Sequence, residues 1–246
     1  MTRRQYKNPP IEEALCEFRF AGGAEWDLAV PARFHERLRA EYPGKPRNQS
    51  VLSANVVAGP QAPASLAMVQ GLAKLQFPDA DAKRLVSLAP DLLSVHVLRP
   101  YSGWEDFRRR IKDALDVYRS ICAPVSILRL GVRYINRVTP PGGDPLDLRQ
   151  YFLCEPQPIN GLPSQLASFV HRVEHVYEDG IRLFLTYASI EATAAPEFLL
   201  DLDVIHEPSS PQSIDGIMDV VNDLHAREGA AFEAIITDKS RGLFDA

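Results

Sequence analysis

Three arginines recur at every fourth position of the stretch LRLGVRYINRV, residues 128–138. The stretch alternates in polarity, which predicts a β-strand with Arg129, Arg133 and Arg137 on one face. Successive guanidinium groups would lie roughly 14 Å apart, because a strand advances by ~3.4 Å per residue. That spacing is too wide for one small anion. It predicts either a charged groove or a solvated, charged sheet face.

Carboxylates occur at alternate positions of two other expected strands. The first strand turns Glu13, Glu17 and Arg19 to one side, and a late strand does the same with Asp201 and Asp203. One interpretation is that these acids pair with the arginines across the strands of an ordinary charged sheet face. A second is a concave face that binds an anionic or polar partner. A third is a catalytic charged tunnel.

The overall charge argues against nucleic acid as the main partner. The chain of 246 residues carries 27 Lys and Arg against 32 Asp and Glu, a formal net charge of −5. Proteins that bind nucleic acid usually carry a basic excess, so only a local basic groove would serve here. The run Arg108-Arg109-Arg110 is one candidate, although on a helix it is more typical of a solvated face.

Cysteine usage and hydropathy favour a cytoplasmic protein. Cys16, Cys122 and Cys154 are far apart and form no CxxC motif, which is typical of reduced thiols. No apolar segment follows the basic N-terminus, so a secretory signal is not expected. The chain also lacks the run of ~18 apolar residues that a membrane helix needs. We therefore expect cytoplasmic localisation and no membrane partner.

The order of the expected elements predicts an α+β fold. Strands are expected at 14–20, 74–77, 84–98 with a turn near 89–91, 128–138, 166–177, 181–190 and 198–207, and helices at 29–42, 102–122 and 213–236. No glycine-rich turn from strand to helix is present, which excludes a doubly wound nucleotide-binding fold. We expect largely antiparallel sheets with a charged face, and helices packed on the other face.

The same pattern predicts two closely packed halves, residues 1–140 and 146–246, divided at the TPPGGDP stretch of 139–145. Ser102 followed by Glu105 predicts a capping box at the start of the second helix. Gly229 is a potential break in the last helix. Tyr101 and Trp104 belong either to a recognition surface or to the buried stripe of the second helix.

Metal chemistry has weak support in the sequence. Asp201 and Asp203 could offer carboxylate oxygens to Mg²⁺, but one alternating pair is little evidence. His171 and His175 lie too far apart on a strand to bind one zinc at ~2.0–2.1 Å. No nucleophile-elbow, zinc-protease, P-loop or kinase motif is present. We expect no metal site and no cofactor.

Five short stretches carry a resemblance to a known family. They are YKNPPIEEA at 6–14, EFRF at 17–20, YSGW at 101–104, GVRYINR at 131–137 and FEAIITD at 232–238. Together they resemble a sporadically distributed family of bacterial proteins of about this length. The resemblance spans nearly the whole chain and implies no established activity or fold. Such a distribution suggests genes that travel with mobile or defence-associated loci, and hence a regulatory or interacting role.

A second resemblance is to the triphosphate-tunnel class. In that class an early strand with alternating glutamates and later strands with Arg, Lys, Asp or Glu line an antiparallel barrel. Glu17 with Arg19, Arg129 with Arg133, and Asp201 with Asp203 are similar to that order. The chain departs from the pattern at Leu15, where the class has a metal-binding glutamate.

Two hypotheses about function follow. The first is a non-enzymatic cytoplasmic binding or regulatory protein that recognises a partner protein, or alternatively a nucleic acid or nucleotide, through the charged face. Arg129, Arg133 and Arg137 would supply donors, with Arg19 beside them, and the four carboxylates would orient them. The alternative is a metal-dependent phosphohydrolase of triphosphate-tunnel type that acts on nucleotide or polyphosphate.

Overall fold

The fold is taken from a computed structural model of the chain. It describes residues 4–23, 26–49, 74–141, 148–154, 161, 168–190 and 196–246, and the backbone alone of 52–59 and 62–70. The linker expected at 139–145 and the start of the strand expected at 166–177 lie mostly or partly outside these residues.

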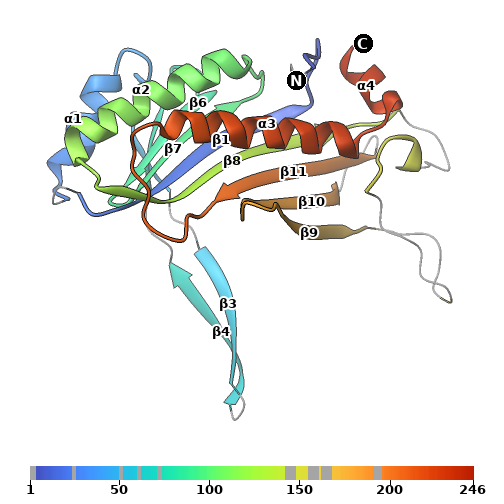
Figure 1. Ribbon diagram of the computed structural model, residues 1–246, viewed down its shortest axis with the longest axis horizontal. Coiled ribbons are helices and arrows are strands. Elements are labelled where there is room, and N and C mark those ends of the chain that lie inside the picture. The colour runs from blue at the N-terminus through green and yellow to red at the C-terminus, as the bar shows by residue number, and fades with distance from the viewer. Residues whose placement is uncertain are drawn as a thin grey trace.

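The described elements form an α+β fold (Figure 1). The helices are α1 (Ala29–Leu38), α2 (Trp104–Cys122), α3 (Ile217–Ile235) and α4 (Asp238–Phe244), with a 3₁₀ turn at Leu148–Gln150. The strands are β1 (Ile11–Ala21), β2 (Arg47–Gln49), β3 (Leu52–Gly59), β4 (Ala62–Gln70), β5 (Lys74–Pro78), β6 (Arg84–Ala89), β7 (Leu92–Leu98), β8 (Ser126–Val138), β9 (Val170–Val176), β10 (Arg182–Ile190) and β11 (Glu197–His206). The expected fold class is confirmed.

Nine strands form one antiparallel sheet in the order β2-β5-β6-β7-β1-β8-β11-β10-β9, and β3 pairs with β4 in a second sheet. The central strand β8 pairs with β1 on one side and with β11 on the other. Residues before and after the expected linker therefore contribute to one continuous sheet. Within the described residues the sheet is open, with β2 and β9 at its edges, whereas the triphosphate-tunnel resemblance implies a barrel.

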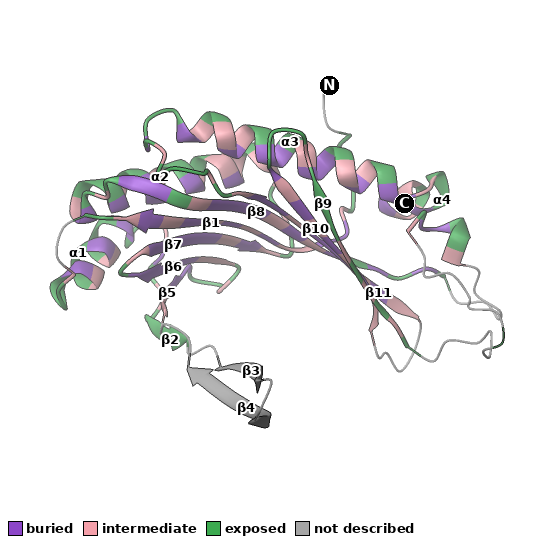
Figure 2. Cartoon of the chain, turned by 60° about the horizontal axis from the view of Figure 1, so that its bottom comes forward, coloured by how far each residue is buried: buried purple, intermediate pink, exposed green. Residues whose placement is uncertain are grey.

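The two faces of the large sheet differ in chemistry because side chains alternate along each strand. On β1, Ala14, Cys16 and Phe18 are fully buried beneath the helices. Helices α1, α2 and α3 lie on this side of the sheet (Figure 1). On β8 the same side carries Leu130, Val132 and Tyr134, all at 0% exposure. Figure 2 shows the resulting bands of buried residues along the strands that the helices cover.

The opposite face is where the predicted site residues lie. Strand register places eight of them on this side of three adjacent strands, and we call this set the charged sheet face: Glu13, Glu17 and Arg19 on β1, Arg129, Arg133 and Arg137 on β8, and Asp201 and Asp203 on β11. No helix of the described residues packs on it (Figure 1). On the central strands β1, β8 and β11, one side of the sheet is thus covered by helices and the other carries charged side chains, as predicted.

Two local predictions about helices were wrong. Helix α2 begins at Trp104 after Gly103, whose φ of 99° is open to glycine and strained for other residues, and no side chain caps it. Ser102 lies one residue too early, and its hydroxyl donates to Asp106 Oδ2 at 2.5 Å. Helix α1 ends at Leu38 rather than near residue 42, although Tyr42 is still buried.

Helix α3 runs unbroken through Gly229, which is buried on its sheet side. Its first residue is Ile217, later than the expected 213, because Gly216 adopts a left-handed conformation just before it. Strands β2, β3 and β4 were not predicted, since the residues from 47 to 70 show weaker alternation and several residues typical of turns.

Candidate functional site

Arg133 and Asp201 form an ion pair of the charged sheet face that is held by two hydrogen bonds. The Arg133 guanidinium donates Nε and Nη2 to the two carboxylate oxygens of Asp201 at 2.7 and 2.6 Å. The Asp201 side chain is 11% exposed and that of Arg133 is 38% exposed. The hydrogen bond to Asp201 raises the pKa of Arg133, although burial opposes the shift. The pair uses two of the five guanidinium N–H groups.

Glu17 is the carboxylate that gathers the most cations. Its Oε1 accepts hydrogen bonds from Arg19 Nε at 3.0 Å and Arg129 Nη1 at 3.1 Å, and its Oε2 accepts one from Lys74 Nζ at 2.9 Å. Burial disfavours the charged carboxylate, but the Lys74 hydrogen bond and the surrounding positive charge outweigh it and lower the pKa of Glu17. Glu17 therefore joins β1, β8 and β5 through one ionised group.

Arg129 also reaches towards β11. Its Nη2 lies 3.7 Å from Asp203 Oδ2, and its Nε lies 3.5 Å from Glu207 Oε1. Gly131 stands between Arg129 and Arg133 on the same face, and a Cβ there would meet Asp203 and Arg129 at 3.4–3.7 Å. These are ordinary van der Waals distances, so the site has space for a Cβ.

Asp203 has an unusual environment among these carboxylates. Burial raises the pKa of Asp203 to about 6. The positive charges of Arg129 and Arg133 lower this pKa in part, but the negative charges of Asp201 and Glu17 act against them. Its ion pair with Arg129, at 3.7 Å, is longer than a hydrogen bond. The Asp203 carboxyl therefore changes charge near pH 6.

The remaining predicted residues lie at the flanks of the face. Arg137 Nη1 donates to Glu197 Oε2 at 3.0 Å, and Arg137 Nε lies 3.8 Å from Glu12. Glu13 lies 2.7 Å from Nδ1 of His96 on β7. Burial disfavours ionised Glu13, but this contact and the charges of His96 and Arg133 lower the pKa of the carboxyl.

The structure thus places all eight predicted residues together, with pairing across strands as the first interpretation expects. Four guanidinium groups face four carboxylates, so the set is balanced when every group is charged. Aliphatic side chains stand between the ion pairs, among them Leu15, Ile135 and Leu199, which are partly exposed. The face is therefore a mixed surface of ion pairs and small apolar patches.

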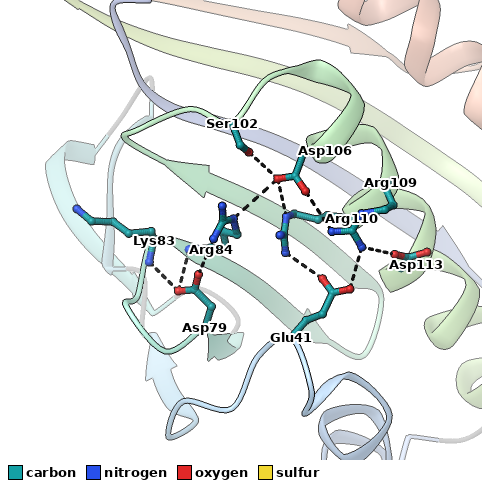
Figure 3. A network of polar contacts seen from close by, with 9 residues as sticks. All are labelled: Glu41, Asp79, Lys83, Arg84, Ser102, Asp106, Arg109, Arg110 and Asp113. Carbon is teal, nitrogen blue, oxygen red and sulfur yellow. Dashed lines mark hydrogen bonds and ion pairs between the residues drawn. The ribbon is translucent and has the colours of Figure 1, made fainter.

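The basic run of α2 lies away from this face and is used within the protein. Arg109 and Arg110 both donate to Glu41, at 2.8 and 2.9 Å, and both bind Asp106 (Figure 3). Arg84 approaches the same Asp106 carboxylate at 3.9 Å. The network joins α2 to the end of the α1 segment and to β6.

Two other charged residues of α2, Arg108 and Asp106, are also engaged within the protein. Arg108 donates Nε to Asn222 of α3 at 2.8 Å. Burial disfavours ionised Asp106, but hydrogen bonds from Arg110, Ser102 and Arg109 lower its pKa to about 2. The run is thus engaged in ion pairs and helix packing.

A cavity of about 550 Å³ lies on the helix-covered side of the sheet. It is bounded by the N-terminal segment that precedes β1 (residues 4–10), by the start of α2 and by helix α3. Figure 1 shows the N-terminal segment passing between α2 and α4. The lining includes Tyr6, Tyr101, Trp104, Asn136 and His225. Four of the five stretches that carry the family resemblance supply lining residues. We call this cavity the N-terminal pocket.

Aromatic and polar side chains both line the N-terminal pocket. Trp104 stacks on His225 with ring centroids 3.6 Å apart and 7° between the planes. Tyr134 Oη lies 3.0 Å from Tyr101 Oη and 3.1 Å from His225 Nδ1. Asn136, at 1% exposure, donates Nδ2 to the carbonyls of Leu200 and Tyr134. No donor among the described residues binds its Oδ1.

Sequence reasoning missed both the N-terminal pocket and several partners on the charged sheet face. Lys74, His96, Glu197 and Glu207 complete ion pairs there. Each belongs to, or directly follows, a strand that was expected from the sequence. Alternation alone does not show which strands lie side by side. Tyr101 and Trp104 were considered as a recognition surface, and the structure places them at the pocket wall.

The fold and the two sites define an α+β protein built on an open antiparallel sheet. No model of a known protein family matches the chain, and no curated protein matches it in sequence.

Two observations concern the described residues alone. No helix there is both long enough and apolar enough to cross a lipid bilayer. No three His, Cys, Asp or Glu side chains there are grouped so that they could hold a metal ion.

Proposed function

We propose that this chain is a non-enzymatic cytoplasmic binding protein, with a regulatory role, that recognises a partner protein through the charged sheet face. The observation that carries the proposal is the placement of all eight predicted residues on three adjacent strands that no described helix covers. A sheet of this size covers one face with helices and leaves polar groups of the other available for contact.

The composition of the face favours protein over nucleic acid as the partner. Four positive and four negative side chains offer no excess of charge to a phosphate backbone, whose binding depends on cationic residues. Protein interfaces instead combine arginine, paired charges and apolar contact, which is the mixture of this face. Arg137, at 43% exposure, and Arg133, at 38%, are the donors best placed to meet a partner.

The ion pairs within the charged sheet face are compatible with partner recognition, because they hold the arginine side chains in place before a partner binds. The two-point contact with Asp201 fixes the plane of the Arg133 guanidinium, so less side-chain freedom is lost when its remaining N–H groups bind. Glu17 holds Arg129 and Arg19 by one hydrogen bond each to its Oε1. Such a surface discriminates partners by the geometry of charge more than by net charge.

The cytoplasmic location in this proposal is supported by the cysteines. Cys16, Cys122 and Cys154 are all free thiols, and burial raises the pKa of each. Thiols kept protonated by burial are unreactive and suit a reducing compartment.

The alternative, a metal-dependent phosphohydrolase, stays a prediction with less support. Asp201 would have to exchange its two hydrogen bonds with Arg133 for a metal ion, and Glu17 would have to exchange those with three cations. Release of phosphate from nucleoside triphosphates or tripolyphosphate, with Mg²⁺ or Mn²⁺ added, is the assay that would support it.

The proposal is tested by affinity capture of the tagged chain from its native cells at moderate salt. Absorbance at 260 and 280 nm and mass spectrometry then define what is bound. A stoichiometric protein companion is the expected result. Capture of nucleic acid in its place would contradict the assignment of partner class, and capture of nothing would contradict the binding function.

A further inference from the structure

The N-terminal pocket lies on the opposite side of the sheet from the charged sheet face, so binding in the pocket is independent of the proposed function of that face. Its volume of about 550 Å³ is within the range of small-molecule sites, ~300–1,000 Å³. A register shift in β1 between Ile11 and Glu13 interrupts its pairing with β8 beside Asn136. Pro10 at this point accepts a hydrogen bond from Arg137 N at 2.8 Å.

One end of the pocket attracts negative charge. The 19-residue helix α2 begins there with Gly103 and Trp104 in the lining, and its first N–H groups have no side-chain cap. An uncapped start of a long helix presents donors and a partial positive charge. Lys7 also lines the pocket and makes no ion pair within the described part of the chain. Two acids lie on the same turn and oppose part of this field: the exposed Glu105, and Asp106, which is paired with Arg109 and Arg110.

The wall beside this helix start, which shares Trp104, suits a planar group with a hydrogen-bond donor. The Trp104 and His225 rings stack on each other, and both residues line the pocket. Asn136 adds an acceptor, because its Nδ2 is committed to two backbone carbonyls while its Oδ1 has no donor among the described residues. Asn136 as a whole residue is 1% exposed and lines the pocket, and an acceptor without a protein donor at such a wall favours a ligand that brings an N–H or O–H group.

We propose that the N-terminal pocket binds a small molecule that joins an anionic group to a planar ring with a donor edge, the class that includes nucleoside monophosphates. The anion lies at the start of α2 near Lys7, the ring packs on Trp104, and the donor edge meets Asn136. Stacking on an aromatic side chain together with a helix N-terminus is a general means of holding such molecules.

Intrinsic fluorescence offers a direct test, because the chain has two tryptophans, Trp26 and Trp104. A Trp26→Phe variant of the full chain leaves Trp104 as its one tryptophan. This protein is titrated with AMP, GMP, CMP and UMP, and in separate arms with inorganic phosphate and with adenosine. Calorimetry on the unmodified chain checks each dissociation constant.

The expected result is quenching of Trp104 by at least one of the four nucleotides, at least tenfold tighter than by phosphate or adenosine alone. Lys7→Gln should weaken that nucleotide at least fivefold with an unchanged melting temperature, since Lys7 is exposed. Lys112→Gln is the matched control, because Lys112 lies on an exposed part of α2 and should leave binding unchanged.

Three results would overturn the inference. One is the absence of binding by all four nucleotides at millimolar concentration. Another is phosphate binding as tight as nucleotide binding, which would assign no role to the ring. The third is an equal loss of affinity in the Lys7→Gln and Lys112→Gln variants, which would mean that the nucleotide binds elsewhere.

Discussion

Arg133 and Asp201 lie on neighbouring strands, but not opposite one another: the register sets Arg133 against Asp203, and the guanidinium turns to Asp201 two residues along. Diagonal reach of this kind is available to long side chains on an antiparallel pair. Because Arg133 is engaged with Asp201, Asp203 is left with a long ion pair to Arg129.

Removal of one partner of this pair should cost more than removal of both charges. Arg133→Ala leaves the Asp201 carboxylate, at 11% exposure, without its two donors, and we expect a loss of about 2 kcal/mol in the free energy of unfolding. The double variant Arg133→Gln with Asp201→Asn removes both charges and should stay within about 1 kcal/mol of the original protein. Urea unfolding measures both. Equal losses in the two variants would mean that the pair is not coupled.

Asp203→Asn should stabilise the protein near neutral pH. The folded pKa of Asp203, about 6, lies above that of an unfolded aspartate, ~3.9, so the folded state holds the extra proton between these values. Stability from this group is present at low pH and is lost as pH rises through about 6. The variant should therefore gain up to about 3 kcal/mol at pH 7.5 and almost nothing at pH 4. Urea midpoints at the two pH values check this, and an equal effect at both would show that titration is not the cause.

Asp106→Asn should destabilise the network of Figure 3 at neutral pH. The folded pKa of Asp106, about 2, lies below the unfolded value, so its contribution is present above ~3.9 and is lost as pH falls towards 2. Because the side chain is 26% exposed, solvent screening reduces the expected loss to about 1 kcal/mol at pH 7. The control is Asp113→Asn, at 43% exposure, which should have little effect. Similar losses in both variants would contradict a special role for Asp106.

Gly103→Ala should destabilise the start of α2 through the backbone alone. A Cβ would find open space there, but the φ of 99° should cost a non-glycine residue about 1–3 kcal/mol. Gly242→Ala is the matched control, because this position in α4 is equally open and has no positive φ. Thermal unfolding should show a lower melting temperature for the first variant alone. A melting temperature unchanged in both would contradict the conformation assigned to Gly103.

Alternation along single strands was enough to predict the fold class and the common face of the site residues. Arg129, Arg133 and Arg137 differ from their buried neighbours on β8 at every second position, and the same holds for Glu17 on β1. Strand order was not predictable in this way, because alternation reports which face a residue occupies and not which strand lies beside it. The link between Glu17 and Lys74 therefore became visible only with the structure.

The N-terminal pocket could not be predicted for a related reason. Tyr101 and Trp104 read as the start of a buried helix stripe, and Asn136 reads as one more residue on the core side of β8. Their meeting with His225 depends on the packing of α2 and α3 side by side on the sheet. The capping box failed for a local reason, since a glycine at positive φ can begin a helix without a side-chain cap.

The central claim is that the charged sheet face binds a partner protein. Its most direct test is affinity capture with three forms of the chain: the original, the face variant Arg133→Gln with Asp201→Asn, and the control variant Lys112→Gln with Asp116→Asn, which removes an exposed ion pair on α2. We predict that the same companion protein is held by the original and the control and is lost from a folded face variant. A companion held equally by all three forms would contradict the claim.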